Sequence, residues 1–455
     1  MKSLLKNNWQ SLVLGLLSFL THFLFLNYPS QIVFDEMYYS GFVKDYFTRQ
    51  FYFCIHPPTG KLMIYFFSRI FGLKDLSIPN AIGQVFNAGD ALILRFLPAF
   101  FGSIFILLIY YLILKIGLSK KAAFLGAVLV LCDNAILTQS KLVLLDIFLL
   151  FFGFLSFYFL LSFKDALQGS KKAYCFLALA AVSAGLSFSV KWTGLSFGGL
   201  VGLFFVFDVF KNFNARRVAL NLLIIVVLPF LIYYSIFVVH FLILTKPGSG
   251  DVVMSSAFQN MQNSVSPSSN PTMWQKFVEL NQKMSFYNST TTSFHAFGSK
   301  WFQWPLGKRP IWYWSKSSAG KVSNIYLVGN FVVWWAVFLG VAFSFIFLPY
   351  EFFRKKLPPI FYLLTFGYFI NLLPFVFITR VAFLYHYFPS LIFGILILAV
   401  LYDTFLKNTK HIEIYYWSFI GLVSLCFLLI SPLTYGMPLP LSISHYYSSF
   451  VGFFL

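Results

Sequence analysis

The stretch WQSLVLGLLSFLTHFLFLN (residues 9–27) decides the class of this protein. An apolar run of that length crosses a bilayer as a helix. Phe34-Asp35-Glu36-Met37-Tyr38-Tyr39 follows directly, and FCIHPPTGK (residues 53–61) comes after it. Two adjacent carboxylates where the chain leaves a membrane are costly beside hydrocarbon, so we expect Asp35 and Glu36 to have a function. Their position suits a general base for a substrate that arrives from the membrane.

The composition identifies a polytopic membrane protein. Of 455 residues, 59% are hydrophobic, 22% aromatic and only 10% charged, and the mean hydropathy is +0.78. A soluble domain with these proportions would expose far too much hydrocarbon. Lys2 and Lys6 precede the first apolar run, and no small-residue cleavage site follows it. We therefore expect a retained anchor helix with the N-terminus in the cytoplasm.

The net charge of +19 does not indicate a nucleic-acid partner, because the basic residues form short clusters between apolar runs. Such clusters are typical of cytoplasmic turns under the positive-inside rule, and they also favour anionic lipid headgroups. The clusters are Lys120-Lys121, Lys171-Lys172, Lys211 with Arg216-Arg217, Arg354-Lys355-Lys356, and Lys407 with Lys410. The four cysteines have neither metal-ligand spacing nor the pattern of a disulfide framework.

Apolar segments between these clusters predict an all-α protein with about eleven transmembrane helices. The predicted spans lie near residues 9–27, 92–117, 122–138, 142–163, 173–190, 193–210, 217–244, 325–348, 357–378, 382–403 and 412–432. We expect an N-terminal transmembrane catalytic module (1–244) with an extracytoplasmic loop at 28–91, a second such loop at 245–324, and a C-terminal transmembrane module (325–455). Within the first loop, the amphipathic stretch 60–72 is expected to form a short interfacial helix. No internal repeat is visible, which weighs against a repeat-built transporter.

The alternating topology places several charged residues on one side of the membrane. Arg95, Lys191 and Arg380, with His56 and His386, could surround a phosphate, whereas a carboxylate would take the proton of an incoming hydroxyl. Such a division suits a sugar linked to a lipid phosphate. Each residue has a plainer interpretation as well: Asp146 could pair with a cation of a neighbouring helix, and a carboxylate of the Asp35-Glu36 pair could cap a helix.

Aromatic residues form a second set of candidates. Trp301, Trp304, Trp312 and Trp314 cluster near the end of the second loop. They would provide either a stacking surface for a sugar or peptide, or an interfacial belt. We assign the acceptor or sugar pocket to Asp146, Trp192, Trp304, Trp314 and Tyr385.

Six blocks of sequence resemble the protein O-mannosyltransferases. They are Phe34–Glu36 with His56–Lys61, Asp133–Lys141 with Leu144–Asp146, Gly185–Gly194, Trp304–Leu306 with Arg309–Trp314, Ile325–Asn330, and Phe383–Pro389. They occur in order over nearly the whole chain. The resemblance implies the GT-C glycosyltransferase fold and inverting transfer of mannose from a polyprenyl-phosphate donor to Ser or Thr of secreted proteins.

The resemblance also implies roles for single residues. Asp35 would be the base and Glu36 would assist or position it, while Arg95, Lys191 and Arg380 would surround the donor phosphate, with His56 and His386 in matching motifs. The second loop lacks the β-trefoil insertion of eukaryotic members, which suggests a prokaryotic member in the plasma membrane with its active site extracytoplasmic. No cofactor is expected. A divalent metal on Asp35, Glu36 and Asp146 is the alternative.

Three other functions stay open from the sequence. The first is a GT-C transferase that uses the same kind of donor on a lipid or glycan acceptor. The second is a transporter of lipid-linked sugars, which would distribute its polar residues through the depth of the bilayer instead of gathering them at one face. The third is a non-catalytic partner subunit, since members of the family pair up. The expected partners are the lipid donor, an acceptor polypeptide and membrane lipids, and the sequence leaves open whether the chain forms a dimer.

Overall fold

A computed structural model describes residues 2–73, 81–87, 89–211, 213–262, 271–290, 294–354 and 357–454. Lys355, Lys356 and residues 263–270 lie outside the described residues. The chain forms two compact units. The first unit comprises Met1–Pro29, Pro98–Leu142 and Phe294–Leu455, and the second unit comprises Ser30–Leu97 and Val143–Ser293. These units do not follow the boundaries predicted at residues 244 and 324.

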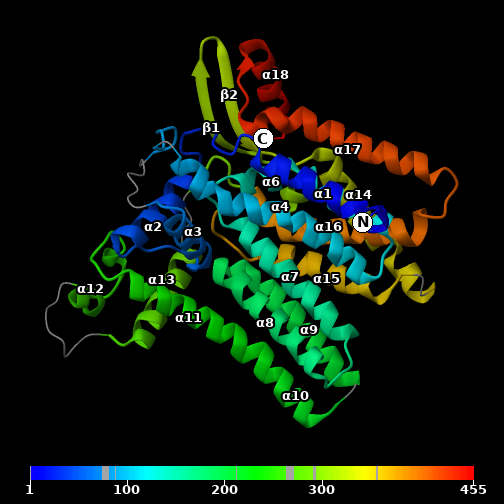
Figure 1. The fold of residues 1–455 in the computed structure, drawn as a ribbon, viewed down its shortest axis with the longest axis horizontal. Helices are drawn as coiled ribbons and strands as arrows, with labels where there is room; N and C mark the ends of the chain where they lie inside the picture. The colour runs from blue at the N-terminus through cyan, green and yellow to red at the C-terminus, as the bar shows by residue number, and fades with distance from the viewer. Residues whose placement is uncertain are drawn as a thin grey trace. The chain divides into compact units, whose positions relative to one another are not determined.

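The first unit combines helices from both ends of the chain. Its elements are α1 (Lys2–Phe23), most of α4 (Asp90–Ile116), α5 (Lys120–Leu131), α6 (Asn134–Lys141), β1 (Ile311–Ser318), β2 (Lys321–Leu327), α14 (Phe331–Arg354), α15 (Pro359–Leu372), α16 (Phe388–Leu401), α17 (Ile412–Tyr435), β3 (Leu439–Pro440) and α18 (Leu441–Gly452). The three strands form a small antiparallel sheet in the order β1-β2-β3, and α18 lies beside it (Figure 1). The sequence did not predict these strands, two of which lie in or at the edge of the second loop.

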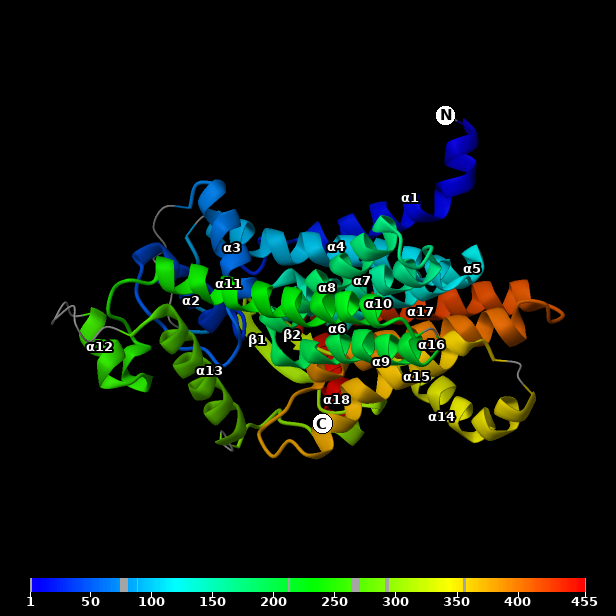
Figure 2. The same cartoon turned by 90° about the horizontal axis from the view of Figure 1, so that it is seen from below.

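The second unit holds the helices around Asp35. They are the start of α4, α2 (Glu36–Thr48), α3 (Thr59–Ile70), α7 (Asp146–Asp165), α8 (Lys171–Val190), α9 (Leu195–Lys211), α10 (Ala215–Leu222), α11 (Leu228–Ile243), α12 (Ser256–Gln262) and α13 (Met273–Thr290). The α3 helix fulfils the prediction of a short helix near residues 60–72. Figures 1 and 2 both show α13 beside α11.

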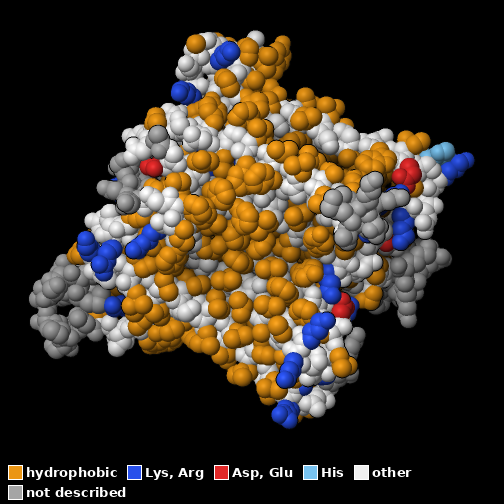
Figure 3. Space-filling view, viewed as in Figure 1, with side chains coloured by type: hydrophobic (Ala, Val, Ile, Leu, Met, Phe, Trp, Pro, Cys, Tyr) orange, Lys and Arg blue, Asp and Glu red, His pale blue; other side chains and the backbone are white. Residues whose placement is uncertain are grey.

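Each predicted span falls on at least one helix, although the number eleven stays a prediction. Seven helical runs in the described residues are long and apolar enough to cross a membrane: Asp90–Ile116, Asp146–Asp165, Lys171–Val190, Ala215–Ile243, Pro359–Val376, Leu384–Leu406 and Ile412–Tyr435. An eighth is counted if α5 and α6 form one broken span. In agreement, hydrophobic side chains cover most of the face seen in Figure 3, and Lys and Arg lie at its margins.

The predicted span 122–138 consists of two helices, because α5 and α6 meet at a 60° bend. Asp133 sits in the break, where its Oδ1 accepts from the Ile136 N–H at 2.9 Å and caps α6. Its Oδ2 accepts from the Trp334 indole N–H at 2.6 Å. A carboxylate that caps a helix start favours a new helix over continuation of the old one.

The α7–α8 hairpin sets the position of two candidate residues. Its helices pack closely along their length, with Ser156 Oγ donating to the Ala180 carbonyl at 2.8 Å and Ser187 Oγ to the Leu149 carbonyl at 2.9 Å. Such small polar residues allow close helix contact inside a membrane. Because the helices run in opposite directions, the start of α7 and the end of α8 lie at the same end of the hairpin (Figure 1).

Candidate active site

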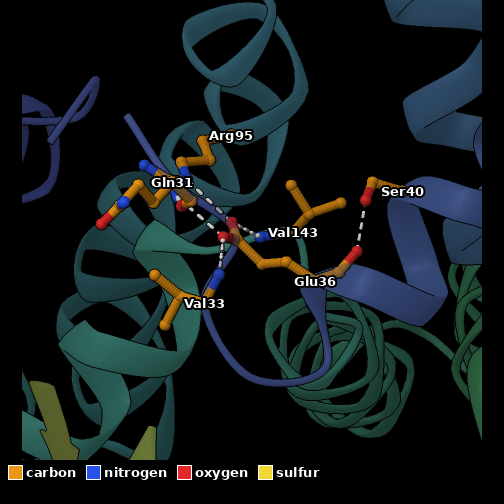
Figure 4. Close-up of polar contacts among 6 residues, drawn as sticks. All are labelled: Gln31, Val33, Glu36, Ser40, Arg95 and Val143. Carbon is orange, nitrogen blue, oxygen red and sulfur yellow. Dashed lines mark hydrogen bonds and ion pairs between the residues drawn. The ribbon is translucent and has the colours of Figure 1, made fainter. Parts of the chain in front are cut away.

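Glu36 is a buried anchor of the second unit. Its side chain is fully buried, and its Oε1 accepts from Arg95 Nε at 2.7 Å and from the Val143 N–H at 3.0 Å. Its Oε2 accepts from Arg95 Nη2 at 2.7 Å and from the Val33 N–H at 3.0 Å (Figure 4). Four donors occupy the carboxylate, so Glu36 has no lone pair left for an incoming proton or a metal ion. The pair is a bidentate clamp that holds the loop before α2.

The phosphate contact predicted for Arg95 does not fit this geometry. Arg95 is fully buried, and its guanidinium is taken up by Glu36 and by the Gln31 carbonyl, to which Nη2 donates at 3.0 Å. A planar guanidinium committed to a bidentate carboxylate points its donors at that partner. Arg95 therefore positions the Asp35 loop through Glu36.

Asp35 has the opposite environment from its neighbour. It is half-buried at the start of α2, and its carboxylate neither caps the helix nor accepts a hydrogen bond from the described part of the chain. Burial raises the pKa of Asp35 to about 6, while the charge of Lys191 lowers it and that of Asp146 raises it. The preceding Phe34 has a left-handed φ of +49°, which a bulky residue rarely adopts. Such backbone strain is typical of functional sites.

Lys191 and Asp146 form an ion pair close to Asp35. Lys191 Nζ donates to Asp146 Oδ1 at 2.7 Å, and both side chains are about nine-tenths buried. Asp146 begins α7 and Lys191 ends α8, so the hairpin described above brings them together. For Asp146, the structure thus shows the pairing with a cation of a neighbouring helix that the sequence left open. A buried pair of this kind fixes the position of the ammonium.

His56 lies in a loop held by Lys61, a residue that was not among the predicted site residues. Lys61 is buried, and its Nζ donates to the His56 carbonyl at 2.7 Å. The ammonium lies 5.5 Å from the ring centre of Phe42 and 5.6 Å from that of Tyr52, and burial lowers the pKa of Lys61. The HPPTGK motif contained the signal, since a lysine two residues after a Pro-Pro-Thr turn at the start of a helix is poorly placed to reach water. We assign Lys61 a positioning role.

Gly60 of the same motif permits close helix packing. A Cβ at this position would lie 2.7 Å from Leu145 Cδ2 and 3.3 Å from Phe148 Cδ2. Any larger residue here would force the Leu145 side chain to shift, so glycine favours the close approach of α3 to the start of α7. The motif thereby brings His56 and Lys61 to the end of the hairpin that carries Asp146.

In the first unit, His386, Tyr385 and Trp304 come together. The ring of His386 stacks on Tyr385 at 4.7 Å and on Trp304 at 5.9 Å between centroids. The Nδ1 atom of His386 lies 2.9 Å from the Phe383 carbonyl oxygen. Arg380 is half-buried just before this group. His386 and Tyr385 are each half-buried, so their rings are partly open to a ligand.

Two of the predicted tryptophans do not form a sugar surface. Trp304 is fully buried, with its indole N–H donating to Ser299 Oγ at 2.8 Å, and Trp314 is 2% exposed. A ring without exposed area cannot stack on a sugar, so both side chains stabilise the core of the first unit. Trp192 in the second unit is half-buried, and its indole N–H donates to the Tyr233 hydroxyl at 2.9 Å.

No group of three or more His, Cys, Asp or Glu suited to a metal ion is found among the residues that the structure describes. The alternative metal site of Asp35, Glu36 and Asp146 does not fit either, because four hydrogen-bond donors already occupy the Glu36 carboxylate. What the second unit does assemble is one available carboxylate beside a fixed ammonium. That arrangement can accept a proton and can stabilise a nearby anion.

Comparisons with known proteins match this chain along most of its length. Residues 12–245 match the family model of dolichyl-phosphate-mannose-protein mannosyltransferases, and residues 273–450 match the C-terminal four-transmembrane region of protein-O-mannosyltransferases. Protein O-mannosyltransferase 1 of Drosophila melanogaster is 33% identical over 259 residues, which is 55% of this chain and 29% of that protein. Protein O-mannosyl-transferase 1 of Rattus norvegicus is 30% identical over 271 residues, 55% of this chain and 36% of that protein. The alignments thus span about a third of these relatives.

Solved structures share the fold. The Pmt1-Pmt2 complex of S. cerevisiae bound to the sugar donor superposes with a TM-score of 0.83 at 17% identity, covering 95% of this chain and 90% of the other. ArnT from Cupriavidus metallidurans bound to undecaprenyl phosphate gives a TM-score of 0.56 at 16% identity, covering 94% and 65%. At such identities the likeness concerns the fold, which is GT-C. The family model covers more than half of the chain, and the chain therefore belongs to the dolichyl-phosphate-mannose-protein mannosyltransferase family.

Proposed function

We propose that this protein transfers mannose from a polyprenyl-phosphate-mannose to Ser or Thr hydroxyls of proteins, with inversion, at the extracytoplasmic face of a prokaryotic plasma membrane. The observation that carries the proposal is the contrast between two adjacent carboxylates. Glu36 is fully occupied, whereas Asp35 accepts no hydrogen bond from the described residues and has a pKa raised to about 6. A carboxylate of that kind is ionised at neutral pH and matched to its task as a general base.

The donor phosphate would lie beside Lys191. Asp146 fixes the Lys191 ammonium at 2.7 Å, and a fixed positive charge stabilises the charge that develops on a leaving phosphate. Within the second unit, His56 is proposed as a further contact to the donor. For Arg380, His386 and Tyr385, the proposed contact with the donor or the sugar rests on the sequence motifs alone.

A groove in the second unit suits the prenyl tail. It is a cavity of about 440 Å³ between α8, α9 and α11, lined almost entirely by apolar groups that include Ala184, Gly198 and Gly199. Small residues leave room for a chain between helices. Tyr233 lines the groove and accepts the Trp192 hydrogen bond, so the groove reaches the residue next to Lys191. A tail in this groove would place its phosphate near the ammonium.

The reaction would occur in one displacement. The acceptor oxygen attacks C1 of mannose while Asp35 takes the hydroxyl proton, and the bond between C1 and the phosphate oxygen breaks with its electron pair going to the phosphate. One attack inverts the configuration, so a single base is sufficient and no glycosyl-enzyme intermediate forms.

The test uses the full chain in lipid nanodiscs with polyprenyl-phosphate-mannose and a Ser/Thr peptide. We expect the peptide to gain one hexose, with the anomeric configuration opposite to that of the donor. Asp35→Asn should lower the rate about 10²–10⁴-fold. Asp45→Asn is the matched control. Burial also raises the pKa of Asp45 to about 6, but this residue lies near the other end of α2 from Asp35.

Near-normal transfer by Asp35→Asn would refute the role of Asp35. Hexose found on a lipid or glycan acceptor, with the peptide unmodified, would assign this chain to the other branch of GT-C transferases. Because the S. cerevisiae structure is that of a Pmt1-Pmt2 complex, we include pairing with a second family chain in the proposal. If nanodiscs that hold a single chain are fully active, pairing with a second chain is not needed for transfer.

A further inference from the structure

A cavity of about 650 Å³ with a mixed polar and apolar lining lies in the second unit, away from the proposed catalytic residues. It is formed where α2, α3 and the end of α11 meet, and Arg49 and Arg69 both line it. The rest of its wall includes Tyr46, Tyr65, Leu242 and Ile243. A cavity of this size with two guanidinium groups suits an anionic ligand.

The positive charge of this cavity is not neutralised by the residues that the structure describes. Arg69 Nη1 donates to the Tyr65 hydroxyl at 2.8 Å, which is a neutral partner. Neither Arg49 nor Arg69 forms an ion pair with a residue that the structure describes, unlike Arg95 or Lys191. Two arginines that share a cavity without a carboxylate repel each other until an anion lies between them.

The surroundings of the cavity are those of a membrane interface. Leu242 lies at the end of a helical run, Ala215–Ile243, in which few residues are fully buried, and Leu242 is itself 62% exposed. Beside Arg69, Ile70 is 78% exposed, and Phe66 and Phe71 are exposed as well. Exposed apolar side chains next to an arginine at a helix end mark the depth at which hydrocarbon gives way to headgroups.

We propose that Arg49 and Arg69 bind the phosphate of an anionic phospholipid headgroup, with the acyl chains lying along the exposed end of α11. Each guanidinium can grip phosphate oxygens in a bidentate manner. Under the proposed topology these arginines lie on the extracytoplasmic side, where positive residues are otherwise disfavoured, and a lipid ligand gives them a reason to be there.

This lipid site is separate from the catalytic centre. Asp35 precedes the first residue of α2 and Arg49 follows the last, so the helix holds them about 20 Å apart at 1.5 Å per residue. Occupancy of the site is therefore independent of the transfer reaction and can be measured without donor or acceptor.

The experiment titrates phosphatidylglycerol into the purified protein in zwitterionic nanodiscs and follows amide hydrogen exchange. We expect slower exchange in the α2 and α3 segments that line the cavity. Arg49→Gln should weaken the apparent affinity about fivefold and Arg49→Gln with Arg69→Gln about 25-fold, since each arginine near a membrane surface contributes about that factor. Lys316→Gln with Lys321→Gln, which removes two exposed charges from the β1–β2 hairpin, is the matched control and should bind as the parent does.

Arg69→Gln removes the hydrogen bond to the Tyr65 hydroxyl and could disturb that side chain. Arg49→Gln avoids this problem, because the Arg49 side chain makes no hydrogen bond to a described residue. A second arm replaces phosphatidylglycerol with inorganic phosphate in purely zwitterionic nanodiscs. Protection by phosphatidylglycerol alone supports a lipid site. Equal protection by inorganic phosphate, or unchanged phosphatidylglycerol affinity in both arginine variants, would overturn the proposal.

Discussion

Glu36→Gln should destabilise the protein severely, whereas Asp35→Asn should leave its stability intact. In the wild type, four donors converge on the Glu36 carboxylate, two of them from the fully buried Arg95. Glutamine keeps one of the two oxygens and replaces the other with an NH₂ group, so the two donors that faced the replaced oxygen lose their acceptor. The Arg95 charge is then buried without a counter-charge.

The expected magnitude follows from that geometry. Removing one partner of a buried pair costs about 3–5 kcal/mol of unfolding free energy. Asp35 accepts no hydrogen bond from a described residue, and burial disfavours its charge, so its amide replacement should change stability by about 0.5 kcal/mol or less. The two variants should therefore differ in what they lose: Glu36→Gln loses stability, whereas Asp35→Asn keeps its stability and loses only the transfer rate.

The assay is equilibrium unfolding in mixed micelles with increasing denaturing detergent, together with the transfer rate per folded molecule. Glu36→Gln combined with Arg95→Met should be less destabilised than the sum of the two single variants, because the unpaired charge is gone. Glu36→Gln that melts like the wild type but transfers as slowly as Asp35→Asn would refute the structural role of Glu36 and make it a participant in the chemistry.

Three further outcomes follow from the described contacts. Below pH 6, kcat/KM should fall about tenfold per pH unit, since Asp35 must be ionised to accept a proton. Lys191→Met removes the charge that lowers the pKa of Asp35, so the acid limb of the pH profile should move to higher pH. An acid limb that stays in place would contradict the interaction between Lys191 and Asp35. Lys61→Met removes the hydrogen bond from Lys61 Nζ to the His56 carbonyl and should cost about 1–3 kcal/mol in the same unfolding assay. Asp133→Ala should cost about 1 kcal/mol for the lost α6 cap and a further 1–3 kcal/mol for the orphaned indole N–H, with the rate per folded molecule unchanged.

The membrane spans could be predicted because hydropathy is a local property. An apolar run followed by a basic cluster identifies a span from its own residues alone, and helices were found at each predicted range. The bend between α5 and α6 was missed, although Asp133 caps α6 locally through the Ile136 N–H; its second contact, with Trp334, comes from 201 residues further along the chain. The β1–β2 hairpin was missed as well, because it lies in a segment whose aromatic content suggested either a stacking surface for a sugar or peptide or an interfacial belt.

The importance of Asp35-Glu36 was also evident from the sequence, but the assignment of Arg95 to the phosphate was not correct. Its guanidinium is committed to Glu36, and the sequence cannot show which of several cations is committed to which carboxylate. Trp304 and Trp314 were misassigned for a related reason. Whether an aromatic ring faces a ligand or a core depends on what packs over it, and in the first unit other side chains cover both rings.

By itself, the sequence determined the membrane class, the approximate positions of the helices, the family and the acidic pair at the edge of the first span. The tertiary structure alone decided which member of that pair is available for chemistry. Its partners come from 59 and 107 residues further along the chain, where Arg95 and Val143 meet Glu36. Two residues adjacent in sequence have nearly identical intrinsic acidity, and only the distant groups folded around each one make the first a base and the second an anchor.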